Sequence, residues 1–273
     1  MPRRSTDLQG GGQVQITPLI PPEGVAKGCL PRTSRIGQDC PLAAERLPYV
    51  IPQEEWAGII PNADLRPLVP FGLYQDGVGS CASESCGQAI QIKIVQAGFA
   101  PVKLNPWTQY RTVSGGVDRG STLGDNLKHA RDVGICSYDF WPRYDDTTWD
   151  DPDGPRIIHP WYSTPEGDWE GNARNFRIDE FWECTTVAEV GTCLILGHPV
   201  SFGWQGHSCV LTKLVSTTSA EYRNSWGDGW GDMGFGIVSL SAIDIRYGAY
   251  AVRSVIVPSQ EVLPPDPQKR QAA

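Results

Sequence analysis

The 273-residue sequence has no apolar run long enough to cross a membrane and no apolar segment behind its basic N-terminus. A membrane-spanning helix needs about 20 consecutive apolar residues, and runs such as Val190 to Leu196 are far shorter. A secretory signal needs an apolar core of about 7 to 15 residues, which the opening MPRRSTDLQGGGQ lacks. The sequence therefore predicts no membrane span. It also favours a cytoplasmic or assembly-associated location over a secreted one.

Positive charge is scarce, with 23 Lys and Arg against 31 Asp and Glu, for a net charge of −8. This balance argues against a nucleic-acid partner. The whole excess lies between Asp139 and Glu183, which hold 12 acidic residues, 4 Arg and five of the ten tryptophans. Such a segment is either a surface loop with solvated carboxylates or the border of a cleft that attracts basic substrates. The sequence leaves both readings open.

Metal-binding signatures are missing as well. None of the eight cysteines forms a CxxC pair, and there are only four histidines. A zinc site is therefore not expected, and nothing points to another cofactor. Without a signal sequence, free thiols are favoured over a disulfide framework. A local bond between Cys29 and Cys40 is left open.

The N-terminal part is rich in proline, with 11 of the 23 prolines in residues 1–70. Proline fixes φ and removes a backbone donor, so residues 1–64 are expected to form an extended arm that packs along the body or docks onto a larger assembly. The folded domain is placed at residues 65–257, and residues 258–273 are expected to be a flexible tail. Within the domain, apolar periodicity and turn residues predict helices first and strands second. The expected helices are 85–99, 122–133 and 186–196, and the expected strands are 200–204, 208–214, 220–224, 234–240 and 249–257.

Three widely separated stretches carry residue types suited to nucleophilic catalysis. They are YQDGVGSCASESCG at 74–87, GWQGHSCVLTKL at 203–214 and EYRNSWGDGWGDMGF at 221–235. Together they resemble the papain-like cysteine peptidases (the C1 family), especially the bacterial members. In that family a Gln lies six residues before the nucleophilic Cys, and a Gly-His pair and an Asn-Ser-Trp-Gly run lie near the C-terminal end. Here the same order is Gln75, Cys81, His207 and Asn224.

The resemblance covers residues 65–257 and implies an α+β fold. A helical lobe at about 71–144 and a β-rich lobe at about 186–257 would enclose an active-site cleft. The separations from Cys81 to His207 and to Asn224 are 126 and 143 residues, close to the 130 to 150 residues usual in the family.

The expected chemistry centres on Cys81, at the point where a Gly-rich turn meets a predicted helix. A helix N-terminus and an adjacent imidazolium both stabilise a thiolate, so the pKa of Cys81 is expected to be low, about 3 to 4 as in papain. His207 would activate the thiol and protonate the leaving amine. Asn224 would orient the imidazole, and Gln75 would contribute to an oxyanion hole.

Supporting roles follow from the same motifs. Gly79 and Ser80 form the turn before the nucleophile, and the resemblance implies that Trp226 covers the hydrogen bond between His207 and Asn224. Glu84 is unusual, because a carboxylate suits the first turn of a helix but opposes thiolate formation.

Other residues of the same types lack this context. Cys86 lies five residues after Cys81, about 140° around a helix, so it is expected to be a core residue. His129, His159 and His198 have no motif partners and are expected to be surface or packing residues.

These observations predict a cysteine-type endopeptidase that cleaves peptide or protein substrates through an acyl-thioester, without a cofactor. Two alternatives remain. The first is a non-catalytic scaffold or assembly protein, for example a virion component, on the same fold. The second is an amidase or acyl transferase.

Overall fold

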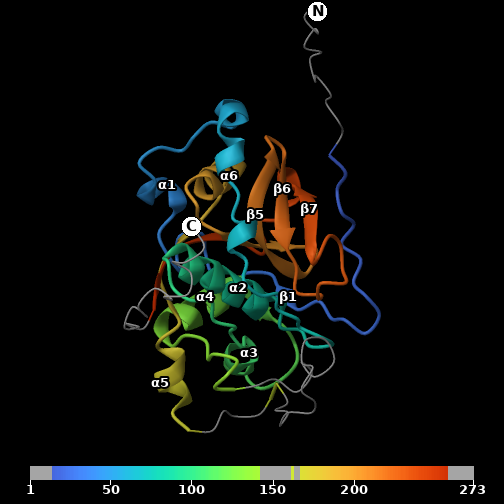
Figure 1. Ribbon diagram of the computed structural model, residues 1–273, viewed down its shortest axis with the longest axis vertical. Coiled ribbons are helices and arrows are strands. Elements are labelled where there is room, and N and C mark those ends of the chain that lie inside the picture. The colour runs from blue at the N-terminus through green and yellow to red at the C-terminus, as the bar shows by residue number, and fades with distance from the viewer. Residues whose placement is uncertain (1–13, 142–160, 163–166, 258–273) are drawn as a thin grey trace, which may run out of the picture.

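The computed structural model describes residues 14–141, 161–162 and 167–257 (Figure 1). Most of the acidic, Trp-rich segment, including Asp145, Asp146, Asp150 and Asp151, lies outside the described residues, as does the expected C-terminal tail. Among the described residues, no helix combines the length and apolarity needed to span a bilayer.

A six-stranded antiparallel sheet forms one half of the molecule, in the order β3-β8-β4-β5-β6-β7. In Figure 1 strands β5, β6 and β7 lie at the upper right, and helices α2 to α5 lie below them. The predicted α+β fold is thus confirmed. The strands are β3 (Arg177–Glu183), β4 (Val200–Trp204), β5 (His207–Ser216), β6 (Ser219–Arg223), β7 (Phe235–Ser239) and β8 (Ala249–Ile256).

Strand β3 corrects the sequence analysis, which expected no strand between Asp139 and Glu183. Its residues RIDEFWE mix charged and apolar side chains, and β3 pairs with β8 along the edge of the sheet. Edge strands often carry charged side chains, which discourage pairing with another chain. The charged residues of β3 interrupt the apolar alternation from which strands were predicted.

Helix α2 (Cys81–Gln96) runs through the centre of the molecule and packs against β5 and α4. It ends before Gly98, whose φ of +84° favours glycine. The helix begins four residues earlier than the predicted Ser85. Cys81 therefore stands in its first turn.

The remaining helices are short. Thr122 and Thr186 cap α4 and α6 by accepting backbone N–H bonds from Asp125 and Glu189 at 3.1 and 3.2 Å. Helices α3 and α5 were not predicted. The helices are α1 (Ala43–Arg46), α3 (Trp107–Val113), α4 (Leu123–Asp132), α5 (Trp169–Ala173) and α6 (Val187–Ile195), with 3₁₀ turns η1 (Gln53–Gly58), η2 (Ile60–Asn62), η3 (Arg66–Leu68) and η5 (Leu240–Ala242).

Residues 31–70, most of which the sequence analysis assigned to the arm, contribute to the core. Trp56 has no exposed surface and packs against Gly191 of α6. Arg32 forms an ion pair with the buried Glu183 at the end of β3. Leu65 donates its N–H to the Thr212 carbonyl of β5 at 2.7 Å. Detaching this part of the chain would expose Trp56 and leave Glu183 without its ion-pair partner.

Residues 14–30, by contrast, lie along the surface and then enter the space between the sheet and the helices. Thr17 exchanges hydrogen bonds with Ile237 of β7 at 2.9 Å, and the Ile20 carbonyl accepts from the Trp230 indole at 3.2 Å. Further along, β1 (Cys29–Leu30) pairs in parallel with β2 (Ser121–Thr122). We refer to residues 14–30 as the covering segment.

Candidate active site

Cys81 is the first residue of α2 and is completely buried. Its sulfur accepts the Gly28 N–H of the covering segment at 3.3 Å, and the nearby backbone amides of Ala82 and Ser208 act to lower its pKa. Ser208 directly follows His207 in β5. Cys81 and His207, 126 residues apart in the sequence, are thus brought close together by the packing of α2 on β5.

His207 and Asn224 meet because β5 and β6 are adjacent antiparallel strands. His207 begins β5, and Asn224 follows the last residue of β6. The imidazole Nε2 lies 2.7 Å from the Asn224 side-chain oxygen. The Trp226 indole stacks on the imidazole with ring centroids 4.4 Å apart and an angle of 28°. The aromatic cover excludes water from the His–Asn hydrogen bond.

Gln75 is also buried, with its side chain fixed from both sides. Its Oε1 accepts the Ser225 hydroxyl at 2.7 Å. Its Nε2 donates to the carbonyls of Val78 and Ala26, both at 2.9 Å. Ala26 belongs to the covering segment, so the amide expected to stabilise an oxyanion holds a peptide carbonyl instead.

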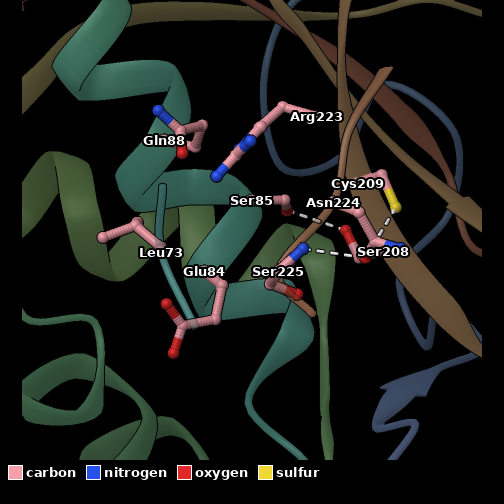
Figure 2. A pocket seen from close by; sticks show the side chains of 9 residues that line it. All are labelled: Leu73, Glu84, Ser85, Gln88, Ser208, Cys209, Arg223, Asn224 and Ser225. Carbon is pink, nitrogen blue, oxygen red and sulfur yellow. Dashed lines mark hydrogen bonds between the residues drawn. The ribbon is translucent and has the colours of Figure 1, made fainter. Parts of the chain in front are cut away.

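The turn before Cys81 is held by side-chain hydrogen bonds. The Gly79 N–H donates to Asp118 at 2.9 Å, and the Ser80 hydroxyl donates to Glu84 at 3.1 Å. Gly79 is needed for space, because a Cβ there would lie 2.9 Å from Asp118 Oδ1 and 3.2 Å from the Tyr110 hydroxyl. Glu84, unexpected so near Cys81, is one of the residues that line a cavity beside the site, and in Figure 2 its carboxylate points away from Ser208 and Asn224.

That cavity has a volume of about 10 Å³, which is close to the space one water molecule needs. Figure 2 shows the Arg223 side chain reaching across it toward the helix that carries Glu84 and Gln88. Arg223 also binds the Asp228 carboxylate and the Met233 carbonyl. It therefore ties together both ends of residues 224–234, the loop that presents Asn224 and Trp226.

Burial controls the charge state of the site. It raises the pKa of the Cys81 thiol to about 11, against the lowering effect of the Gly28, Ser208 and Ala82 amides. It lowers the pKa of His207 to about 3, against the raising effect of Asn224. At neutral pH both groups are therefore uncharged. The low Cys81 pKa expected from the sequence is not found, because burial removes water from the thiol.

The rival residues lie elsewhere. Cys86 is in the core, where its sulfur contacts the Asn126 carbonyl at 3.9 Å and burial raises its pKa to about 12. All eight cysteines are free, so Cys29 and Cys40 are not bonded to one another. His129 and His198 are largely buried within the body, and His159 lies outside the described residues.

The backbone of the covering segment is the feature that the sequence analysis missed. Gly28 supplies the N–H that contacts Cys81, its carbonyl accepts from Ser121 at 2.9 Å, and the Cys29 N–H donates to Gly206 at 2.9 Å. A Cβ at Gly28 would lie 1.9 Å from the Gly79 carbonyl oxygen. In the sequence, Gly28 was the one residue that could have indicated this close approach of two backbone segments. No group of three or more potential metal ligands occurs in the described part of the chain.

Comparison with solved structures places the fold among known proteins. No protein-family model matches the chain, and no curated protein does. Xylellain, a cysteine protease from Xylella fastidiosa, is 21% identical with a TM-score of 0.64, over 87% of this chain and 99% of that one. Digestive procathepsin L2 of Tenebrio molitor is 13% identical with a TM-score of 0.61, over 85% and 78% of the two chains. Procathepsin B of Trypanosoma congolense is 14% identical with a TM-score of 0.57, over 84% and 86%. The chain therefore has the fold of the papain-like cysteine proteases.

Proposed function

We propose that the protein is a cysteine endopeptidase of the C1 family type, with Cys81 as nucleophile. The observation that carries the proposal is the hydrogen bond of 2.7 Å between His207 and Asn224, covered by Trp226, beside a cysteine at a helix N-terminus. These residues come from three distant parts of the sequence. A Cys–His–Asn set with this arrangement has a direct use in acyl transfer.

In the proposed reaction His207 accepts the thiol proton of Cys81, and the thiolate attacks the peptide carbonyl carbon. The carbonyl oxygen becomes an oxyanion, for which the Gln75 amide and the Cys81 backbone N–H are the donors. His207 then protonates the leaving amine as the C–N bond breaks. Water, deprotonated by the same imidazole, hydrolyses the thioester and restores the thiol.

We further propose that this form of the enzyme is latent. The covering segment takes up both groups that a substrate carbonyl would need, the Cys81 sulfur and the Gln75 amide. It also keeps both members of the catalytic pair uncharged by burial. Displacing the segment would hydrate the site, and hydration favours the charged thiolate and imidazolium.

The test uses the full chain with Gly28→Val, since a side chain at residue 28 collides with Gly79 and should displace the segment. In this background, cleavage of a mixed peptide library should be lost on adding Cys81→Ala and kept on adding Cys86→Ala. The matched pair separates the two thiols that lie on α2. Cleavage that survives Cys81→Ala would eliminate the mechanism.

A non-catalytic scaffold is the second candidate, and complete burial of the Cys81 thiol favours it. A brief, low-dose iodoacetamide pulse at mildly acidic pH distinguishes the two. Only a thiolate paired with an imidazolium reacts quickly there. Selective labelling of Cys81 in the Gly28→Val protein supports the peptidase, and its absence supports the scaffold.

A further inference from the structure

A second pair of sulfur atoms, remote from Cys81, makes direct contact. Cys184 follows the last residue of β3, and Cys193 lies on α6. Their sulfur atoms are 3.8 Å apart. All eight cysteines lie in the described ranges, and within those ranges this is the one cysteine pair in hydrogen-bonding contact. The proposed peptidase mechanism uses neither residue.

Hydrogen bonds to neighbouring strands and helices hold the backbone near both cysteines in place. The Cys184 N–H donates to the Ala249 carbonyl of β8 at 2.8 Å. On the other side, the Glu189 carboxylate accepts the Thr185 N–H at 2.7 Å and anchors the start of α6. Neither sulfur belongs to a free loop. Their contact is therefore a property of the packed fold.

A small cavity borders one member of the pair. It has a volume of about 70 Å³, and Cys184 lines it together with mainly apolar side chains such as Val187, Val190 and Ile243. Ile245, which also lines it, is 55% exposed. Cys184 is 3% exposed and Cys193 has no exposed surface, so a reagent must be small and must meet Cys184 first.

We propose that Cys184 and Cys193 are a redox-modification site, at which a small-molecule disulfide converts the two thiols into a reversible disulfide. The deprotonated Cys184 sulfur attacks one sulfur of the reagent, breaks its S–S bond and releases one thiol. The Cys193 sulfur then attacks the mixed disulfide and releases the second thiol. The two protein sulfurs together lose two electrons and two protons, which the reagent gains as two thiols.

The resulting bond joins the end of β3 to α6. It closes a loop of ten residues, and limiting the unfolded chain in this way stabilises the folded state. Since α6 carries Gly191, against which Trp56 packs, the bond fastens the sheet to the helix that holds residues 31–70. It leaves the Cys81 site untouched. Oxidation should therefore raise the stability of the protein.

The experiment treats the full chain with a small disulfide, 2-hydroxyethyl disulfide, alkylates the remaining thiols and cleaves after glutamate. Cleavage after Glu189 separates the two cysteines unless they are bonded. The expected result is a linked pair of peptides containing Cys184 and Cys193. Cys136→Ala, a control at another free buried thiol, should leave the link in place, and Cys193→Ala should abolish it.

Thermal unfolding provides the second measurement. Oxidation should raise the Tm by roughly 5 °C, dithiothreitol should reverse the rise, and Cys193→Ala should not show it. Full alkylation of both cysteines after oxidant treatment of the wild-type chain would overturn the proposal. So would a link that persists in Cys193→Ala. Neither result depends on the peptidase being active.

Discussion

Gly28→Val should activate the proposed enzyme by releasing the covering segment. At this position a Cβ would lie 1.9 Å from the Gly79 carbonyl oxygen and 2.5 Å from its Cα. Both neighbours are backbone atoms, so neither can rotate away. The segment itself must move.

The increase in activity can be estimated from the hydrogen bonds between the covering segment and the site. They are the contacts from Gly28 to Cys81, from Ser121 to Gly28, from Cys29 to Gly206 and from Gln75 to Ala26. At about 1 kcal/mol each, their loss shifts the balance between covered and open forms by about 4 kcal/mol. That corresponds to roughly a thousandfold change in population.

The assay is kcat/KM on a fluorogenic peptide pool, together with the alkylation rate of Cys81. Gly58→Ala is the matched control, because no atom lies within 4 Å of its Cβ position. Both variants should fold, and only Gly28→Val should gain activity and labelling. If a folded Gly28→Val protein kept the wild-type rates in both assays, the covering segment would not control the site.

Four further predictions follow from named contacts. In the Gly28→Val background, Asn224→Ala should lower kcat by roughly a hundredfold, the lower end for general acid–base catalysis, because the imidazole loses its orienting oxygen; an unchanged kcat would remove Asn224 from the mechanism. Arg223→Met should cost about 3 kcal/mol in urea unfolding, since the bonds to Asp228 and the Met233 carbonyl are lost; a change within about 0.5 kcal/mol would mean that Arg223 does not clamp the loop. Arg32→Met should also cost about 3 kcal/mol, because it leaves the Glu183 carboxylate buried without its partner, whereas Arg246→Met, at an exposed pair, should leave stability unchanged; equal effects would contradict this reasoning. Burial raises the pKa of Cys81 to about 11 in the covered form, so its thiolate fraction falls as pH drops below that value, and alkylation of the wild-type chain should accelerate roughly tenfold per pH unit between pH 7 and 10; rapid labelling at pH 5 would refute the covered state.

The sequence predicted which of the candidate residues lie together better than it predicted what surrounds them. Cys81, His207 and Asn224 stand in motifs whose residue types are fixed by their chemistry, so they could be recognised before their contacts were known. Apolar periodicity indicated a helix only from Ser85, whereas α2 begins at Cys81. The residues just before Ser85 are small or polar and show no apolar periodicity. Strand β3 was missed because its charged residues are allowed on the edge of a sheet.

Contacts made by backbone atoms are the hardest to predict from a sequence. The Ala26 carbonyl, the Gly28 amide and the Gly206 carbonyl hold the covering segment in place, yet almost any residue supplies those atoms. Proline content led to an extended arm being expected for residues 1–64, but helix α1 and the 3₁₀ turns η1 and η2 lie within that range. It could not show that Trp56 enters the core, because a single tryptophan among prolines has no periodicity to reveal its partner.

The packing of Trp56 against Gly191 sets a constraint that should be visible in related sequences. A Cβ at residue 191 would lie 2.0 Å from the indole ring, so even alanine requires a smaller side chain at residue 56. Across homologues these two positions should therefore vary together, 135 residues apart in the sequence. Substitution at one position without the other would mark a relative in which residues 31–70 take a different path over α6.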